Sequence, residues 1–202
     1  ATGPTVADEF AFEAPAAVCE EGRRGPAVTV TPELAVIGGS SNVVASYADS
    51  LWVVESQENT VSRYLPGEER LVSGFVDVGA ERNPYDLAFA PTSASTAVGQ
   101  GSAEQQGTED GRVYISNLVS DSLSVASASR GTVIDEISHE SFAYPSGIGI
   151  TDRYIYVGNA NYDPVAAEFG PSSVTVIARS THRVLGVVEV EIGRLLLQIR
   201  EV

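Results

Sequence analysis

The feature that most constrains this chain is a strand–turn–strand stretch that occurs three times. The copies begin at Leu51, Val113 and Ile155 and read LWVVESQENTVSRY, VYISNLVSDSLSVA and IYVGNANYDPVAAEFGPSSVTVI. Each copy has a run of β-branched and aromatic residues, a polar turn and a second such run, which is the pattern of two antiparallel strands. Because each copy is one supersecondary unit, an internal repeat says more about architecture than any single motif does.

The period of the repeat is set by an aromatic residue in the first strand of each copy. Tyr114 and Tyr156 are separated by 42 positions, and Trp52 and Tyr114 by 62. The difference of 20 corresponds to a low-complexity run at positions 92–111, TSASTAVGQGSAEQQGTEDG. Without this run both intervals are equal. A period of about 40–45 residues with four strands per unit is typical of a β-propeller blade.

The sequence therefore predicts an all-β, propeller-like fold of three four-stranded blades plus an extra strand. The blades are predicted at residues 41–78, 83–137 and 144–190, with the second interrupted by the insertion at 92–111. The remaining segments are an extended tail, a closing strand and a C-terminal tail at 1–26, 27–37 and 191–202, respectively. Closed propellers have four or more blades, so three form an incomplete ring. Missing sequence, another chain or a second copy could complete it, and the first two are favoured.

Several stretches resemble the YVTN-type β-propeller repeat. The matching pieces are NPYDLAFAP, RVYISNLVSDSLSV, YPSGIGIT and YIYVGNAN with SSVTVI, and the resemblance covers roughly residues 27–190. It implies a bacterial, exported protein of the periplasm or the extracellular surface. Related propellers include lactonases and quinone-linked dehydrogenase subunits, so the resemblance also leaves an enzymatic role open.

Composition excludes some partners and restricts others. The net charge is −15, and all 12 basic residues are arginine, a balance that disfavours binding to nucleic acid and anionic membranes. No apolar run is long enough for a transmembrane helix. The chain has no methionine, which is expected of a processed, exported protein and equally of a fragment. Cys19 is the single cysteine and is expected to be inert in a tail, with an intermolecular bridge as the alternative.

The candidate binding surface lies on one predicted face of the blades. Loops that join blades, and loops that join second and third strands, are expected to emerge together at 79–84, 118–121, 139–145 and 160–171. The last is longer than its counterparts, and loops carry function more often than cores do. The predicted ligand-binding residues come from the last two loops: His139, Phe142, Tyr144, Asn161, Tyr162, Asp163 and Glu168.

Chemistry at these positions remains open. Asn161, Asp163 and Glu168 are weak candidates for Ca²⁺ ligands because their side chains offer oxygen atoms; otherwise no cofactor is expected. His139 beside Glu140 could act in acid–base chemistry, although a surface histidine is the simpler interpretation. His182 is expected to be solvated in a turn. The sequence lacks a nucleophile elbow, a phosphate-binding loop, a zinc-protease helix motif and a C-x-x-C pair, and no catalytic residue is assigned.

Three functions are therefore compatible with the sequence. The first is an exported, non-enzymatic propeller module that binds a protein, glycan or small ligand on its loop face. The second is part of a propeller enzyme, either a lactonase-like hydrolase or a quinone-linked dehydrogenase subunit. The third is a structural subunit whose unpaired flanks contact a protein partner or missing blades, because an exposed apolar flank tends to associate.

Overall fold

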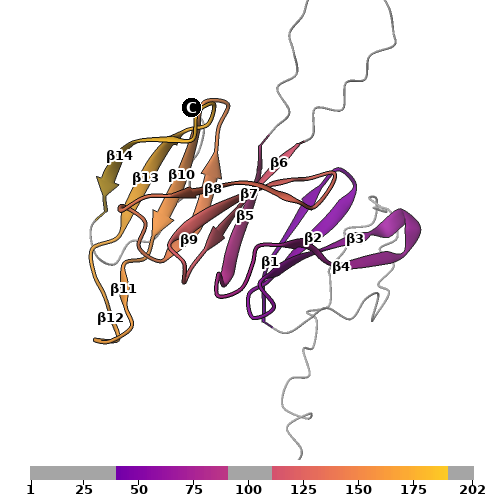
Figure 1. Cartoon of the computed structure of the whole chain (residues 1–202), viewed down its shortest axis with the longest axis horizontal. Helices are drawn as coiled ribbons and strands as arrows, with labels where there is room; N and C mark the ends of the chain where they lie inside the picture. The colour runs from indigo at the N-terminus through magenta and orange to yellow at the C-terminus, as the bar shows by residue number, and fades with distance from the viewer. Residues whose placement is uncertain (1–39, 91–110, 191–202) are drawn as a thin grey trace, which may run out of the picture. The chain divides into compact units, whose positions relative to one another are not determined.

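Three antiparallel sheets of four strands carry the fold (Figure 1). The computed structural model describes residues 40–90 and 111–190. Blade 1 consists of β1 (Ser41–Tyr47), β2 (Ser50–Glu55), β3 (Thr60–Leu65) and β4 (Arg70–Asp77). Blade 2 consists of β5 (Pro84–Ala90), β6 (Arg112–Asn117), β7 (Ser122–Ser127) and β8 (Val133–Ser138). Blade 3 consists of β9 (Pro145–Ile150), β10 (Tyr154–Asn159), β13 (Ser173–Ala178) and β14 (Arg183–Glu189).

Two short elements lie outside the blades among the described residues. A 3₁₀ turn, η2 (Pro66–Glu68), connects β3 to β4. A two-stranded hairpin, β11 (Tyr162–Asp163) and β12 (Glu168–Phe169), is inserted between β10 and β13. Figure 1 shows this hairpin projecting beyond the ends of the blade 3 strands. The sequence predicted a long loop at this position, and the structure shows that the loop contains a hairpin.

The predicted all-β, propeller-like fold of four-stranded blades is confirmed. Each sheet pairs its strands in chain order, and the middle hairpins β6–β7 and β10–β13 lie in different sheets. The predicted tails, the closing strand at 27–37, Cys19 and nearly all of the 92–111 insertion lie outside the described residues. The described part of the chain is thus an all-β, propeller-like arrangement of three blades, and none of its helices could span a membrane.

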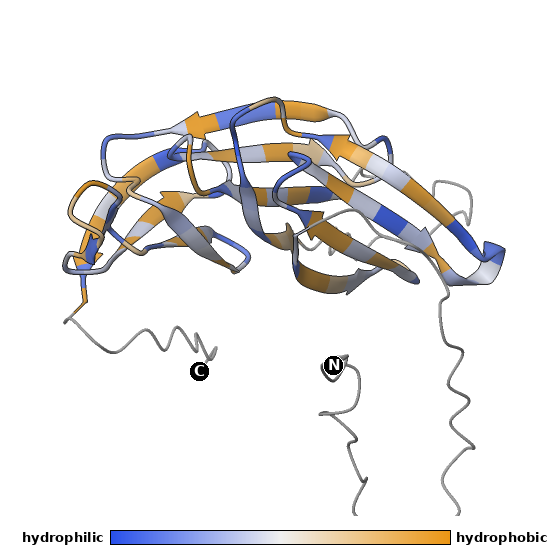
Figure 2. Cartoon of the chain, turned by 90° about the horizontal axis from the view of Figure 1, so that it is seen from below, coloured by the Kyte–Doolittle hydropathy of each residue, from blue (hydrophilic) through white to orange (hydrophobic). Residues whose placement is uncertain are grey.

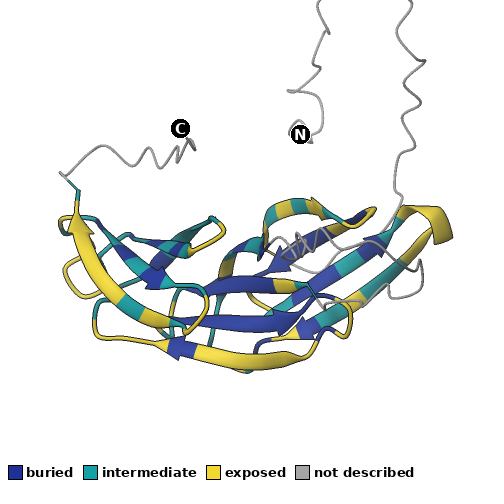
Figure 3. Ribbon diagram, turned by 90° about the horizontal axis from the view of Figure 1, so that it is seen from above, coloured by how far each residue is buried: buried dark blue, intermediate teal, exposed yellow. Residues whose placement is uncertain are grey.

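The core lies between neighbouring blades. Strand β5 contacts β1 and β2 of blade 1 on one side and β9 of blade 3 on the other. Between blades 1 and 2, Trp52 and Val54 pack against Val113 and Ile115. Between blades 2 and 3, Tyr114 packs with Ile155 and other apolar side chains. Successive residues of a strand point to opposite faces, so β6 contributes to both cores. Figures 2 and 3 show the apolar and buried residues along the central strands.

The aromatic residues that set the repeat period differ in burial. Trp52 and Tyr114 are fully buried between blades, and Trp52 makes edge contacts with Phe75 and Phe89 at 5.3 and 5.1 Å between ring centroids. Tyr156 is only half-buried and belongs to neither core cluster. The following blade covers Trp52 and Tyr114, whereas no described sheet follows blade 3.

Candidate interaction face

The loops at one end of the strands are joined by hydrogen bonds between consecutive blades. Asn59 Oδ1, in the β2–β3 turn, accepts from the amides of Arg82 and Asn83 at 2.9 Å each. Asp121 Oδ1, in the β6–β7 turn, accepts from the Tyr144 amide at 2.7 Å. Both turn residues have positive φ, a conformation that Asn and Asp tolerate better than most residues. We call this end of the blades the loop face; it comprises residues 56–59, 77–84, 118–121, 139–145, 160–172 and 189–190.

Below these turns, blades 2 and 3 bury the same polar arrangement. In blade 2, Asn117 Nδ2 donates to Ser122 Oγ at 3.0 Å and Ser124 Oγ at 2.8 Å. In blade 3, Asn159 Nδ2 donates to Ser173 Oγ at 3.3 Å and Thr175 Oγ1 at 3.0 Å. These groups are buried, so hydrogen bonds offset the cost of removing them from water.

Blade 1 uses a carboxylate at the equivalent position. Thr60 Oγ1 and Ser62 Oγ donate to Glu55 Oε2 at 2.9 and 2.5 Å. Most of these hydroxyl residues are buried, which the alternation in the sequence did not predict. Sequence reasoning therefore missed this arrangement. The sequence signal for it is a pattern common to all three copies: the first strand ends on a polar residue, and the second strand carries hydroxyl residues at two alternate positions.

The inserted hairpin gives blade 3 a surface that the other blades lack. Tyr162 and Phe169 are cross-strand partners, with ring centroids 4.9 Å apart. Tyr144, from the loop before β9, contacts Tyr162 edge-on at 5.5 Å. The exposed fractions are 67% for Phe169 and 95% for Val165 at the hairpin tip. Single exposed apolar residues are ordinary, but an apolar cluster on a projecting element is a candidate contact surface.

The structure brings together most, but not all, of the predicted binding residues. Tyr144, Asn161 and Tyr162 meet at the base of the hairpin, where the Asn161 amide donates to the Ala143 carbonyl at 3.1 Å. Phe142 does not line the loop face: it is buried in the core between blades 2 and 3. His139 is exposed, and its Nδ1 lies 2.8 Å from Ser141 Oγ.

Two of the predicted oxygen ligands, Asn161 and Asp163, form hydrogen bonds within the chain. Asp163 Oδ1 accepts from the Val165 and Ala166 amides at 2.8 and 3.1 Å, an Asx-type turn that shapes the hairpin tip. The Asn161 side chain donates to the Pro171 carbonyl. Within residues 40–90 and 111–190, no three His, Cys, Asp or Glu side chains gather where they could hold a metal ion.

Charge is unevenly distributed between the two ends of the blades. The loop face carries eight exposed carboxylates: Glu58, Asp77, Glu81, Asp121, Glu140, Asp163, Glu168 and Glu189. Among the described residues of this face, Arg82 is the one arginine, and it forms a bidentate ion pair with Glu136. This pairing lowers the pKa of the Glu136 carboxyl. The loop face is therefore strongly acidic.

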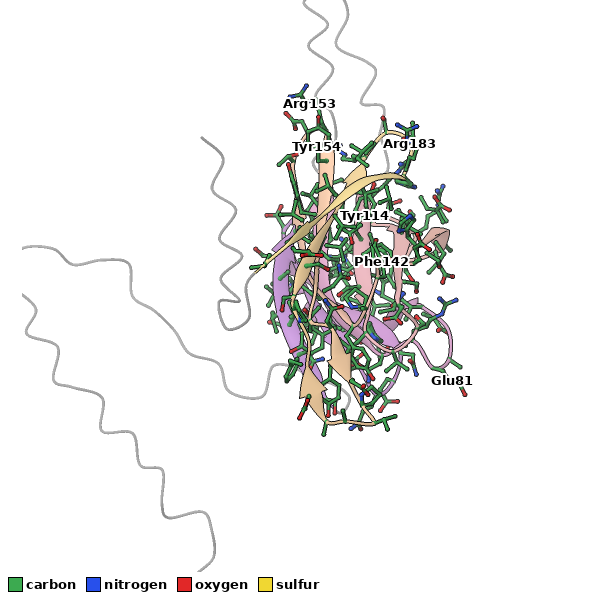
Figure 4. The ribbon with its side chains drawn as sticks, turned by 90° about the vertical axis from the view of Figure 1, so that its left-hand side faces the viewer. Glu81, Tyr114, Phe142, Arg153, Tyr154 and Arg183 are labelled. Atoms are coloured by element: carbon green, nitrogen blue, oxygen red, sulfur yellow. The ribbon has the colours of Figure 1, made fainter. Side chains whose placement is uncertain are left out.

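The opposite end holds most of the described arginines. They lie at strand ends or turns there: Arg70, Arg112, Arg130, Arg153, Arg179 and Arg183. Figure 4 shows Arg153 and Arg183 at one end of the molecule and Glu81 at the other. Among residues 40–90 and 111–190, the loop face is thus rich in carboxylates and poor in arginine, so that a cationic ligand would be attracted to it.

A half-buried carboxyl also links the inner strands of blades 2 and 3. Asp86 Oδ2, on β5, accepts from the Ile148 amide of β9 at 3.0 Å, and its Oδ1 accepts from the Leu87 amide at 2.8 Å. Burial raises the pKa of Asp86 above its ordinary value, and the two amide bonds oppose that rise. Because both oxygens are bonded to backbone amides, this carboxyl holds the blades together.

His182 has a structural role that the sequence did not reveal. The prediction that it is solvated is wrong: its Nδ1 lies 2.6 Å from Asp135 Oδ2 of blade 2, its Nε2 lies 3.1 Å from the Tyr114 hydroxyl, and its side chain is 15% exposed. A carboxylate can only accept, so Nδ1 carries the proton. In the neutral ring, Nε2 then accepts from the tyrosine. The signal was absent because the three residues are far apart in sequence.

The His182–Asp135 contact should make stability depend on pH. The hydrogen bond from His182 is the largest cause of the lowered pKa of Asp135. A carboxyl with a lowered folded-state pKa contributes stability above its unfolded pKa, about 3.9, and loses that contribution as the pH falls through the folded value.

Asp135 is 51% exposed, so we expect Asp135→Asn to cost about 0.5–1 kcal/mol at pH 6. Urea unfolding should show that this difference shrinks towards pH 3. The control is Asp152→Asn, an exposed turn carboxyl. A difference that is constant with pH would contradict the assignment.

Solved structures similar to this chain include two propeller-type proteins. No protein-family model and no curated protein matches the chain. Hydrazine synthase of Kuenenia stuttgartiensis is 19% identical with a TM-score of 0.42, over 71% of this chain and 46% of that one. Virginiamycin B lyase from Staphylococcus aureus is 9% identical with a TM-score of 0.45, over 77% and 56%. The chain thus spans about half the length of both proteins, and its propeller-like fold is established by its own three sheets.

Proposed function

We propose that this protein is an exported, non-enzymatic β-propeller module of the YVTN-repeat type that binds a partner through its loop face. The observation that supports this most directly is the inserted hairpin, which presents Val165 and Phe169 at 95% and 67% exposure. The equivalent turns of blades 1 and 2 are short and hold no strand. A cluster of exposed apolar side chains on a projecting element is typical of a contact surface. The proposal of export rests on the resemblance of the repeat motifs alone.

Binding on the loop face can be tested by NMR with a panel of probes. We expect at least one of four probes to shift backbone amides of the loop face: an alternating Arg/Leu octapeptide, an alternating Glu/Leu octapeptide, chitotetraose and Ca²⁺. Contacts on loops perturb nearby amides, whereas the blades should remain rigid. The Ca²⁺ sample also tests Asn161, Asp163 and Glu168 as ligands.

The matched control is a loop swap. Residues 160–172 are replaced by the four-residue turn of blade 2, Leu-Val-Ser-Asp, at the equivalent position. This variant keeps the blade strands and removes the hairpin. Loss of the shifts in the swap supports the proposal. No shift with any probe, or the same shifts in the swap, would rule out the hairpin as a binding element.

A second candidate function, a subunit of a larger assembly, is favoured by the outer face of blade 3. Tyr156, Val174 and Val176 are half-buried, and Val188 is 56% exposed. The residues at the equivalent positions of blade 2, such as Tyr114 and Leu123, are fully buried against blade 3. This pattern fits a face that another sheet covers. Sedimentation velocity tests this function. If the protein associates and Val176→Glu abolishes the association, the assembly is supported. If the protein is a monomer at all concentrations, this chain does not assemble by itself.

A further inference from the structure

We propose that the β11–β12 hairpin docks a basic peptide segment, with an apolar side chain against Tyr162 and Phe169 and an Arg or Lys against Asp163 and Glu168. This inference rests on the proposed function and names the chemical class of its ligand. Two independent properties of the hairpin carry it: an exposed aromatic side and an uncompensated acidic side.

The aromatic side is the docking surface. Tyr162 and Phe169 face each other in the hairpin, and Tyr144 supports Tyr162 from the loop before β9. Tyr144 is in turn held by the bond from its amide to Asp121. The surface is therefore anchored at its base while Phe169 remains 67% exposed. Aromatic side chains are the usual anchors of peptide contacts because they bury a large area at a low entropic cost.

The acidic side identifies the occupant. Asp163 and Glu168 are the other cross-strand pair of the hairpin, so their side chains lie on the same side. Like charges directly opposite each other are destabilising, and among the described residues neither carboxylate forms an ion pair. A bound cationic group would remove this repulsion. An arginine fork suits two neighbouring carboxylates because it donates to both at once.

The wider surface favours the same class of ligand. Six further exposed carboxylates lie on the loop face, while Arg82 is paired with Glu136. Such a field raises the rate of encounter with a basic partner. Ca²⁺ fits less well because it requires six to eight oxygen ligands, and one oxygen of Asp163 already accepts two turn amides.

The test is fluorescence anisotropy with a labelled, alternating Arg/Leu octapeptide and the full chain at about 50 mM salt. We expect Asp163→Asn with Glu168→Gln to weaken binding about ten-fold, and Phe169→Ser to weaken it similarly, since both contacts contribute to docking. An Arg/Gly octapeptide should bind about ten-fold more weakly than Arg/Leu, and Glu/Leu should not bind. Circular dichroism melts establish that the variants remain folded.

The critical control separates docking from general attraction to an acidic protein. Glu69→Gln with Asp152→Asn removes the same charge from two exposed turns at the opposite end of the blades. We expect less than about a two-fold change in affinity, because screening confines the effect of distant charges. Equal weakening by the two double variants, or equal binding of Arg/Gly and Arg/Leu, would overturn the proposal. If chitotetraose shifts the loop face and the Arg/Leu peptide does not, this inference fails while the proposed function stands. If no probe shifts it, both fail.

Discussion

Replacing Trp52 by alanine should lower the free energy of unfolding by about 3–5 kcal/mol. Trp52 is fully buried between blades 1 and 2, in contact with Phe75 and Phe89, and its ring lies 5.4 Å from the Arg63 guanidinium carbon. Truncation removes these contacts and leaves a cavity that two rigid sheets cannot close, because each sheet is held by its own strand ladder. Urea unfolding followed by far-ultraviolet circular dichroism measures the loss without relying on the single tryptophan.

The same position in blade 3 supplies a matched control. Tyr156→Ala removes an aromatic residue of the repeat from a face that no described sheet covers, so we expect a cost of about 1 kcal/mol or less. A cost for Tyr156→Ala equal to that for Trp52→Ala would show that another part of the chain or a second copy covers blade 3 in solution. Sedimentation velocity on the same sample separates these two causes.

The second large effect is expected at Asn159, for which Asn159→Ala should cost about 2–4 kcal/mol. Its amide nitrogen donates to Ser173 and Thr175, and its oxygen accepts from the Ala143 amide at 3.2 Å. Removing the side chain leaves buried polar groups without these bonds, and a buried unsatisfied group costs more than a typical hydrogen bond contributes. Thermal and urea unfolding measure the change.

Asn159→Asp distinguishes hydrogen bonding from simple loss of volume. The two hydroxyls beside Asn159 can rotate to donate to a carboxylate, as Thr60 and Ser62 donate to Glu55 in blade 1. We therefore expect Asn159→Asp to be less destabilising than Asn159→Ala, although the buried charge still has a cost. If the aspartate variant is as unstable as the alanine variant, the hydrogen bonds do not account for the stability of this site.

The loop face was predictable as a location but not as a surface with particular chemistry. Strand order and turn positions follow from the repeat, and the predicted linking loops do meet there, for example where Asp121 accepts from Tyr144. The orientation of individual side chains was not predictable. Phe142 points into the core and Tyr144 onto the face, and Tyr144 has a positive φ.

What the sequence alone determined is the architecture: a local period of alternating strands specifies four-stranded sheets, and its recurrence specifies three blades, since strand pairing within a blade joins neighbours in the chain. What only the tertiary structure decided is everything that depends on contact between blades. Trp52 and Tyr156 occupy equivalent repeat positions, yet one is buried and the other is not, and His182 meets Asp135 and Tyr114 only across a blade boundary. Burial and electrostatics are set by what covers a residue in space, and a periodic pattern carries no information about where the neighbouring sheets end.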